Sequence, residues 1–149
     1  TFTGYSTIAM AQSLDKDSKI ITIERNLELK NVLEKNLNEY IQSKQVEIVF
    51  DNALNVIPNL NVNPDIVFID GDKREYIDYY NLIFPKIQSG AYILVDNVLW
   101  HNNIFNDNIK SNDYQTKTII KFNEMIKIDI RIEKLLLPIR DGLYIIRKL

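Results

Sequence analysis

The sequence contains no cysteine, one histidine, four glycines and four prolines among its 149 residues. Without cysteine the chain can form neither a disulfide nor a thiolate metal site, which agrees with a reducing compartment and leaves secretion without support. A single histidine excludes a metal site built on two histidines. Because glycine and proline are scarce and scattered, no linker is evident, and we expect one domain over residues 1–149.

Long apolar runs and an excess of positive charge are also missing. No run approaches the roughly 20 apolar residues of a membrane helix, and the first residues lack the basic start and apolar stretch of a signal peptide. The chain has 18 basic and 20 acidic side chains and a pI near 5.4, which argues against nucleic-acid binding through bulk positive charge. Its 46% hydrophobic and 26% charged residues are typical of a globular protein, and we expect a cytoplasmic one without membrane contact.

Short β-branched runs alternate with longer amphipathic stretches, which is typical of βαβ units around a mostly parallel sheet. The two runs 65–70 and 91–96 are continuously apolar, as expected of central parallel strands covered on both faces. Asp141 and Gly142 lie just before the last strand and predict that the final two strands form a hairpin. The predicted strands are 19–24, 46–50, 65–70, 91–96, 131–137 and 143–147. The predicted helices are 5–14, 27–41, 53–60, 74–86 and 114–128.

The predicted helices are interpreted as scaffold. Asn26 and Asp51 are the predicted N-caps of the helices that follow them. An apolar stripe opposite Lys and Glu marks residues 27–41 as amphipathic, and it consists of Leu29, Val32, Leu33, Leu37, Tyr40 and Ile41. Three tyrosines of the next long helix are interpreted as packing residues rather than as a stacking platform, namely Tyr76, Tyr79 and Tyr80.

Acidic and amide side chains stand at the carboxyl ends of the predicted strands, where ligands bind in a doubly wound sheet. Asp70 and Asp96 each close a strand, and Asn97 follows Asp96. If these strands are neighbours about 4.8 Å apart, their oxygen donors converge as a hard divalent cation such as Mg²⁺ requires. The alternative is that each residue caps a helix or forms a turn.

Three further residues are candidates for the same region. Glu24 follows Gly4 by 20 positions, close to the interval between a glycine loop and a ribose-binding acid, although a capping or solvated glutamate explains it equally well. Lys73 follows Asp70 by three positions, so a short loop could hold it as a base, or it is an ordinary surface lysine. His101, the single histidine, is expected in a loop at a pocket rim.

Seven stretches of the chain, taken in order and spacing, resemble one enzyme family. They are TFTGYS (1–6), Glu24, DNA (51–53), VFIDGDK (67–73), DNVLWH (96–101), FNE (122–124) and LPIRDGL (137–143). The family is that of the cation-dependent class I O-methyltransferases of the catechol and caffeoyl-CoA type, with their bacterial relatives. The paired motifs Asp-x-Asp-Lys and Asp-Asn-x-x-Trp make the resemblance specific, and it extends over the whole chain.

The resemblance implies a Rossmann-like fold and transfer of a methyl group from S-adenosylmethionine to a metal-chelated hydroxyl of a catechol-like small molecule. By position it assigns the cofactor to Gly4, Tyr5, Ser6, Glu24, Ala53 and Asp70. It assigns the divalent cation, expected to be Mg²⁺, to Asp70, Asp96 and Asn97. It further makes Lys73 the base, places Asp72 and Trp100 near the substrate, and implies a homodimer.

Other functions stay open. One is methylation of a hydroxylated uridine in tRNA, for which a local basic patch is available in Lys110, Lys117, Lys121 and Lys127. Another is a non-catalytic module on a methyltransferase scaffold. A nicotinamide dehydrogenase is disfavoured because no glycine-rich triplet is present.

Two departures from the family pattern lead to further expectations. The family has substrate-contacting helices and a central first strand before the loop that corresponds to the residues from Thr1 onward. We therefore expect a longer enzyme, a sheet split between 19–24 and 65–70, and little methyl transfer by these residues alone. Arg140 stands where relatives have glycine in the Leu-Pro-x-Gly-Asp-Gly turn, at the expected substrate edge.

Overall fold

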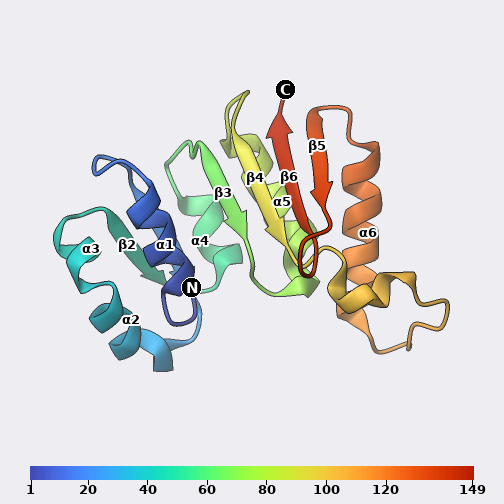
Figure 1. Ribbon diagram of the computed structural model, residues 1–149, viewed down its shortest axis with the longest axis horizontal. Coiled ribbons are helices and arrows are strands. Elements are labelled where there is room, and N and C mark those ends of the chain that lie inside the picture. Colours follow the sequence, from blue (N-terminus) through green and yellow to red (C-terminus); the bar gives the residue numbers. More distant parts are fainter. The chain divides into compact units, whose positions relative to one another are not determined.

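The computed structural model describes residues 1–149, which form two compact units, Thr1–Leu60 and Asn61–Leu149 (Figure 1). None of its helices combines the length and the apolar character that crossing a membrane requires. The single domain expected over residues 1–149 stays a prediction.

The first unit is a parallel strand pair with four α-helices. β1 and β2 pair in register from Ile20 opposite Val46 to Glu24 opposite Phe50. The buried core between strands and helices consists of Ala11, Leu33, Leu37 and Val46. The elements are α1 (Tyr5–Ser13), β1 (Ile20–Glu24), η1 (Leu27–Leu29), α2 (Lys30–Asn36), α3 (Asn38–Gln42), β2 (Val46–Phe50) and α4 (Ala53–Asn59).

The prediction of one continuous helix over 27–41 is wrong, because the helix is interrupted at Leu37, between α2 and α3. The apolar stripe could not reveal the break, since residues on both sides of it serve the same core. Leu33 and Leu37 are fully buried, as the stripe predicts, whereas Val32 is exposed.

One predicted helix cap is confirmed and one is wrong. Asn26 Oδ1 accepts a hydrogen bond from the Glu28 N–H at 3.0 Å. At α4 the cap is Asn52, whose Oδ1 accepts from the Leu54 N–H at 2.9 Å. Asp51 lies one residue too early and instead accepts from the N–H of Asn52 itself.

The second unit contains one four-stranded sheet of order β3-β4-β6-β5. β3 and β4 are parallel, and both pairs that involve β6 are antiparallel, so the predicted final hairpin is confirmed. β1 and β2 form a separate sheet, which confirms the expected split. The elements are β3 (Ile66–Ile69), η2 (Lys73–Glu75), α5 (Tyr76–Ile83), η3 (Phe84–Lys86), β4 (Tyr92–Asp96), η4 (Trp100–Phe105), α6 (Tyr114–Ile128), β5 (Ile132–Leu137) and β6 (Leu143–Lys148).

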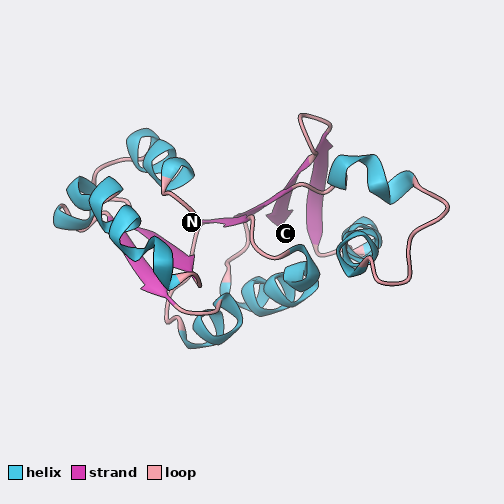
Figure 2. Cartoon of the chain, turned by 90° about the horizontal axis from the view of Figure 1, so that it is seen from below, coloured by secondary structure: helices cyan, strands magenta, loops and turns pink.

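α5 and α6 pack on one face of this sheet (Figure 2). Their tyrosines fill the interface, since Tyr76 and Tyr80 are fully buried and meet the Phe122 ring edge-on at 5.8 and 6.1 Å. The packing role predicted for the tyrosines is therefore confirmed. The prediction that 65–70 is a central strand covered on both faces is wrong, because β3 is an edge strand and Ile66 is 55% exposed. An apolar run records which residues are apolar, not what covers them.

Candidate functional site

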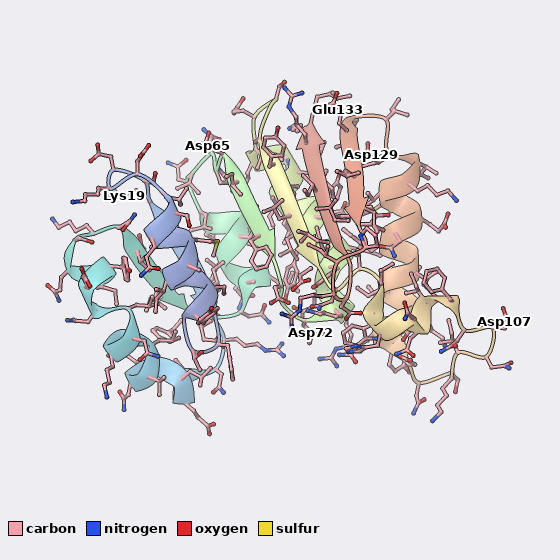
Figure 3. The ribbon with its side chains drawn as sticks, in the orientation of Figure 1. Lys19, Asp65, Asp72, Asp107, Asp129 and Glu133 are labelled. Carbon is pink, nitrogen blue, oxygen red and sulfur yellow. The ribbon has the colours of Figure 1, made fainter.

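The carboxyl ends of β3 and β4 bring Asp70, Asp96 and Asn97 together. The register sets Ile69 opposite Val95, so Asp70 and Asp96, the next residues, lie on adjacent strands about 4.8 Å apart. Figure 3 shows Asp72, two residues after Asp70, where the arrowheads of β3 and β4 end. The register therefore places the backbones of Asp70 and Asp96 at the same edge of the sheet. That the side-chain oxygens of Asp70, Asp96 and Asn97 share a cation stays a prediction.

The turn after β4 gives these donors their local geometry. Asn97 has a left-handed backbone, φ 60°, which asparagine tolerates better than most residues. Its N–H donates to Asp96 Oδ1 at 2.8 Å, which orders that carboxylate and leaves Oδ2 as a further acceptor. The Tyr76 hydroxyl donates to the Asp96 carbonyl at 3.0 Å. Burial, and then the charges of Asp70 and Asp96, raise the pKa of Tyr76, so its hydroxyl stays a donor.

Lys73 is held beside Asp70. Its Nζ donates to Asp70 Oδ1 at 2.8 Å and to the Gly71 carbonyl at 3.3 Å, and it lies 5.2 Å from the centre of the Tyr76 ring. A Cβ on Gly71 would come within 2.9 Å of Tyr79 Cε2, so the loop packs tightly on α5. The Lys73 ammonium group, the predicted base, therefore contacts one of the three predicted cation ligands.

Asp72 is the N-cap of η2 and is held by Arg74. Its Oδ1 accepts from the Arg74 N–H at 3.0 Å, and its two oxygens accept from Arg74 Nε and Nη2 at 2.9 and 2.5 Å. Sequence reasoning missed Arg74. Its role is to hold the Asp72 carboxylate, and nothing in the sequence indicates that the two side chains pair. Arg74 also lines a cavity of about 330 Å³ next to the start of α6.

Trp100 and His101 lie in a short, irregular 3₁₀ segment, where a loop was expected for His101. Both have left-handed backbones, with φ of 46° and 52°, and their rings lie 5.4 Å apart. The His101 N–H donates to Asp141 Oδ1, and Asn123 Nδ2 donates to the Val98 carbonyl at 2.8 Å. Sequence reasoning gave Asp141 only a role in the hairpin turn and gave Asn123 none, although both lie in stretches that carry the family resemblance.

The remaining predicted cofactor residues lie in the first unit. Gly4, φ 88°, is the N-cap of α1, which begins at Tyr5 and Ser6, and Ala53 is the first residue of α4. Each oxygen of Glu24 accepts one backbone hydrogen bond, from Phe2 at 2.9 Å and from Asn26 at 2.8 Å.

Burial raises the pKa of Glu24, but the N–H groups of Asn26 and Phe2, together with the Thr1 amino group at 3.3 Å from Oε2, outweigh it and the net pKa is lowered, so the group is a carboxylate. Glu24 therefore ties two loop backbones together and does not cap the following helix, whose N-cap is Asn26. The two bonds leave further lone pairs on the carboxylate oxygens.

The donor set fits a hard cation by its chemistry. No group of three His, Cys, Asp or Glu side chains is placed to share a metal ion. Asp70, Asp96 and Asn97 differ from such a group because the third donor is an amide oxygen. Two carboxylates and an amide suit Mg²⁺, which typically takes few protein oxygens and keeps several waters.

A family model described as O-methyltransferase matches residues 1–149. A catechol O-methyltransferase of Niastella koreensis is 30% identical over 141 residues, which are 92% of this chain and 63% of that protein. A caffeoyl-CoA O-methyltransferase of Stellaria longipes is 26% identical over 99% of this chain and 65% of its own length. The chain therefore spans less than two thirds of these curated relatives.

Solved structures show the same fold. An O-methyltransferase of Bacillus cereus in complex with SAH superposes with a TM-score of 0.87 at 25% identity, covering 100% of this chain and 71% of that one. An SAH-bound methyltransferase of Podospora anserina does so with a TM-score of 0.87 at 25% identity, covering 99% and 68%. These likenesses confirm the expected Rossmann-like α/β class.

Proposed function

The chain belongs to the O-methyltransferase family, and on that premise we propose that the protein transfers a methyl group from S-adenosylmethionine to a hydroxyl of a catechol-like small molecule. Relatives named for catechol and caffeoyl-CoA support the acceptor class, and the SAH-bound structures support the cofactor. The observation that carries the proposal is Lys73 at 2.8 Å from Asp70, on the strand end next to Asp96 and Asn97.

Asp70, Asp96 and Asn97 would hold the divalent cation, which when bound lowers the pKa of a hydroxyl that it contacts. Lys73 would accept the proton of that hydroxyl. The oxygen then bonds to the methyl carbon while the carbon–sulfur bond breaks and its electron pair stays on sulfur, leaving S-adenosylhomocysteine. Asp72 and Trp100 would lie beside the acceptor, and the protein contributes mainly positioning.

In the first unit, Gly4, Tyr5 and Ser6 would hold the amino-acid end of S-adenosylmethionine. Glu24 would accept from the ribose hydroxyls through the lone pairs that its two backbone bonds leave, and Ala53 would lie beside the adenine. The net lowering of the Glu24 pKa keeps it anionic toward a cationic cofactor.

Isothermal titration calorimetry on the full chain tests both sites. We expect saturable binding of S-adenosylmethionine, weakened by Glu24→Gln, and saturable Mg²⁺ binding, abolished by Asp96→Ala. The matched control is Asp107→Ala, which changes an exposed aspartate in the loop before α6.

Turnover of catechol then separates an enzyme from a non-catalytic module. We expect a low rate of methyl transfer from these residues alone, and Lys73→Ala should abolish that rate while S-adenosylmethionine affinity stays unchanged. Wild-type chain that binds neither ligand would contradict the proposal.

A further inference from the structure

The segment Asn97–Asn102 after β4 is held in an unusual backbone conformation. Asn97, Trp100, His101 and Asn102 all have left-handed backbones, with φ between 46° and 62°. Such conformations are uncommon for side-chain-bearing residues, least so for asparagine, and persist only where surrounding structure imposes them. Something must therefore hold this segment, which begins at one of the proposed cation ligands.

The turn between β5 and β6 holds it through the backbone. The Leu99 N–H donates to the Asp141 carbonyl at 2.9 Å, and the Val98 N–H donates to the Gly142 carbonyl at 3.2 Å. A Cβ on Gly142 would come within 2.5 Å of Leu99 Cγ. The two stretches are in direct contact, with no space for another side chain.

The Asp141 side chain reaches the left-handed residues themselves. Its Oδ1 accepts from the His101 N–H, and the side chain is only 15% exposed. Its Oδ2 is buried and accepts no hydrogen bond. His101 Nδ1 faces that oxygen at 3.7 Å, which is too long for a hydrogen bond.

A buried carboxylate oxygen without a hydrogen-bond partner lowers stability. An aspartate suits the β5–β6 turn, but the turn does not require this buried oxygen, and a role in shaping the neighbouring segment explains it. The other contacts, which include the backbone bonds of Val98 and Leu99, fix the segment only as far as Trp100, so the Asp141 side chain is the contact that reaches the His101 N–H.

We propose that Asp141 is a positioning residue that sets the backbone of Asn97–His101 and thereby the affinity of the Asp70, Asp96 and Asn97 site for a divalent cation. The inference rests on the proposed function, because it takes those three residues as the cation ligands. Asp141 acts through the segment and touches no ligand itself, as groups behind metal ligands commonly do.

Mg²⁺ titration by calorimetry tests this on the full chain and its variants. Asp141→Ala should weaken Mg²⁺ binding by about tenfold or more, the usual effect of removing a group that orients metal ligands. Asp141→Asn should rescue it, because the amide oxygen can still accept from the His101 N–H. Asp107→Asn is the control and should match the wild type. S-adenosylmethionine affinity should be the same in all four proteins.

A merely structural role would lower the melting temperature of both Asp141 variants and leave the Mg²⁺ affinity of the folded protein unchanged, which would overturn the inference. Equal loss of affinity in both variants would overturn it too. If Asp141→Ala does not fold, Asp141→Leu takes its place, with similar shape and no acceptor. A wild type that binds no Mg²⁺ overturns the cation site of the proposed function together with the inference, whereas wild-type affinity in Asp141→Ala overturns the inference alone.

Discussion

At the scale of single residues, two glycines with similar backbones have different surroundings. Gly142 and Gly90 have φ of 82° and 90°, where a Cβ is strained in both cases. At Gly90 a Cβ would meet nothing within 4 Å, but at Gly142 it would lie 2.5 Å from Leu99 Cγ and 3.0 Å from the Leu99 nitrogen. The sequence shows two turn glycines, and only the packing distinguishes them.

Gly142→Ala should therefore destabilise the protein more than Gly90→Ala. The left-handed backbone accounts for about 1–2 kcal/mol in each variant, and overpacking against Leu99 adds about 1–3 kcal/mol at Gly142 alone. Chemical denaturation followed by the fluorescence of Trp100, the single tryptophan, measures the difference within the second unit. Equal destabilisation of the two variants would contradict the crowding at Leu99.

At the scale of elements, one aspartate joins α5, the end of α6 and the start of β5. Asp129 Oδ1 accepts from the Arg131 N–H and Nε, both at 2.9 Å, and Oδ2 accepts from Arg131 Nη2 at 2.6 Å and the Tyr80 hydroxyl at 3.0 Å. The hydrogen bonds from the Arg131 side chain hold the pKa of Asp129 well below its usual range, against the effect of burial.

This network should make the second unit sensitive to acid. A lowered folded-state pKa means that the stabilisation is complete above the unfolded-state value near 3.9 and is lost as the pH falls below it. Asp129→Asn should lower the free energy of unfolding at pH 7 by about 2 kcal/mol and flatten its decline below about pH 4. Urea denaturation at several pH values measures both effects.

The control is Asp107→Asn, whose exposed side chain has no such partners, and it should follow the wild type. Parallel pH profiles for wild type and Asp129→Asn would show that the carboxylate does not carry the acid sensitivity.

At the scale of the whole molecule, charge favours a small acceptor over tRNA. The net charge is −2. Within the possible basic patch, Lys127 pairs with Glu124 at 3.8 Å and Lys117 Nζ donates to the Ser111 carbonyl at 2.7 Å. The homodimer stays a prediction.

We therefore expect no tight binding of unmodified tRNA by the full chain. Any residual affinity should vanish between about 50 and 200 mM salt, since phosphate contacts release counterions. Fluorescence anisotropy with labelled tRNA measures this, and Lys110→Glu with Lys121→Glu shows whether the basic side chains are responsible. Submicromolar affinity that depends on those lysines would favour the tRNA alternative.

Local signals predicted much of this fold. Alternating runs indicated the strands, and Asp141-Gly142 indicated the final hairpin, because turn chemistry depends on a few adjacent residues. The break at Leu37 was not predictable, since it depends on packing between distant segments, whereas the edge position of β3 follows from the split that the family pattern predicted. Likewise Asn52 rather than Asp51 caps α4. Asp and Asn are equally good N-cap residues, so the sequence does not show which of the two adjacent positions is the cap.

The sequence by itself determined the family and the identity of the candidate residues, because their side-chain chemistry and spacing are written in it. Only the tertiary structure decided which of them are neighbours: the β3–β4 register sets Asp70 beside Asp96, and the β5–β6 turn brings Asp141 to His101, 40 positions away. Such contacts depend on strand pairing between separate stretches of the chain. A pattern within one stretch does not show how close that stretch lies to another in the folded protein.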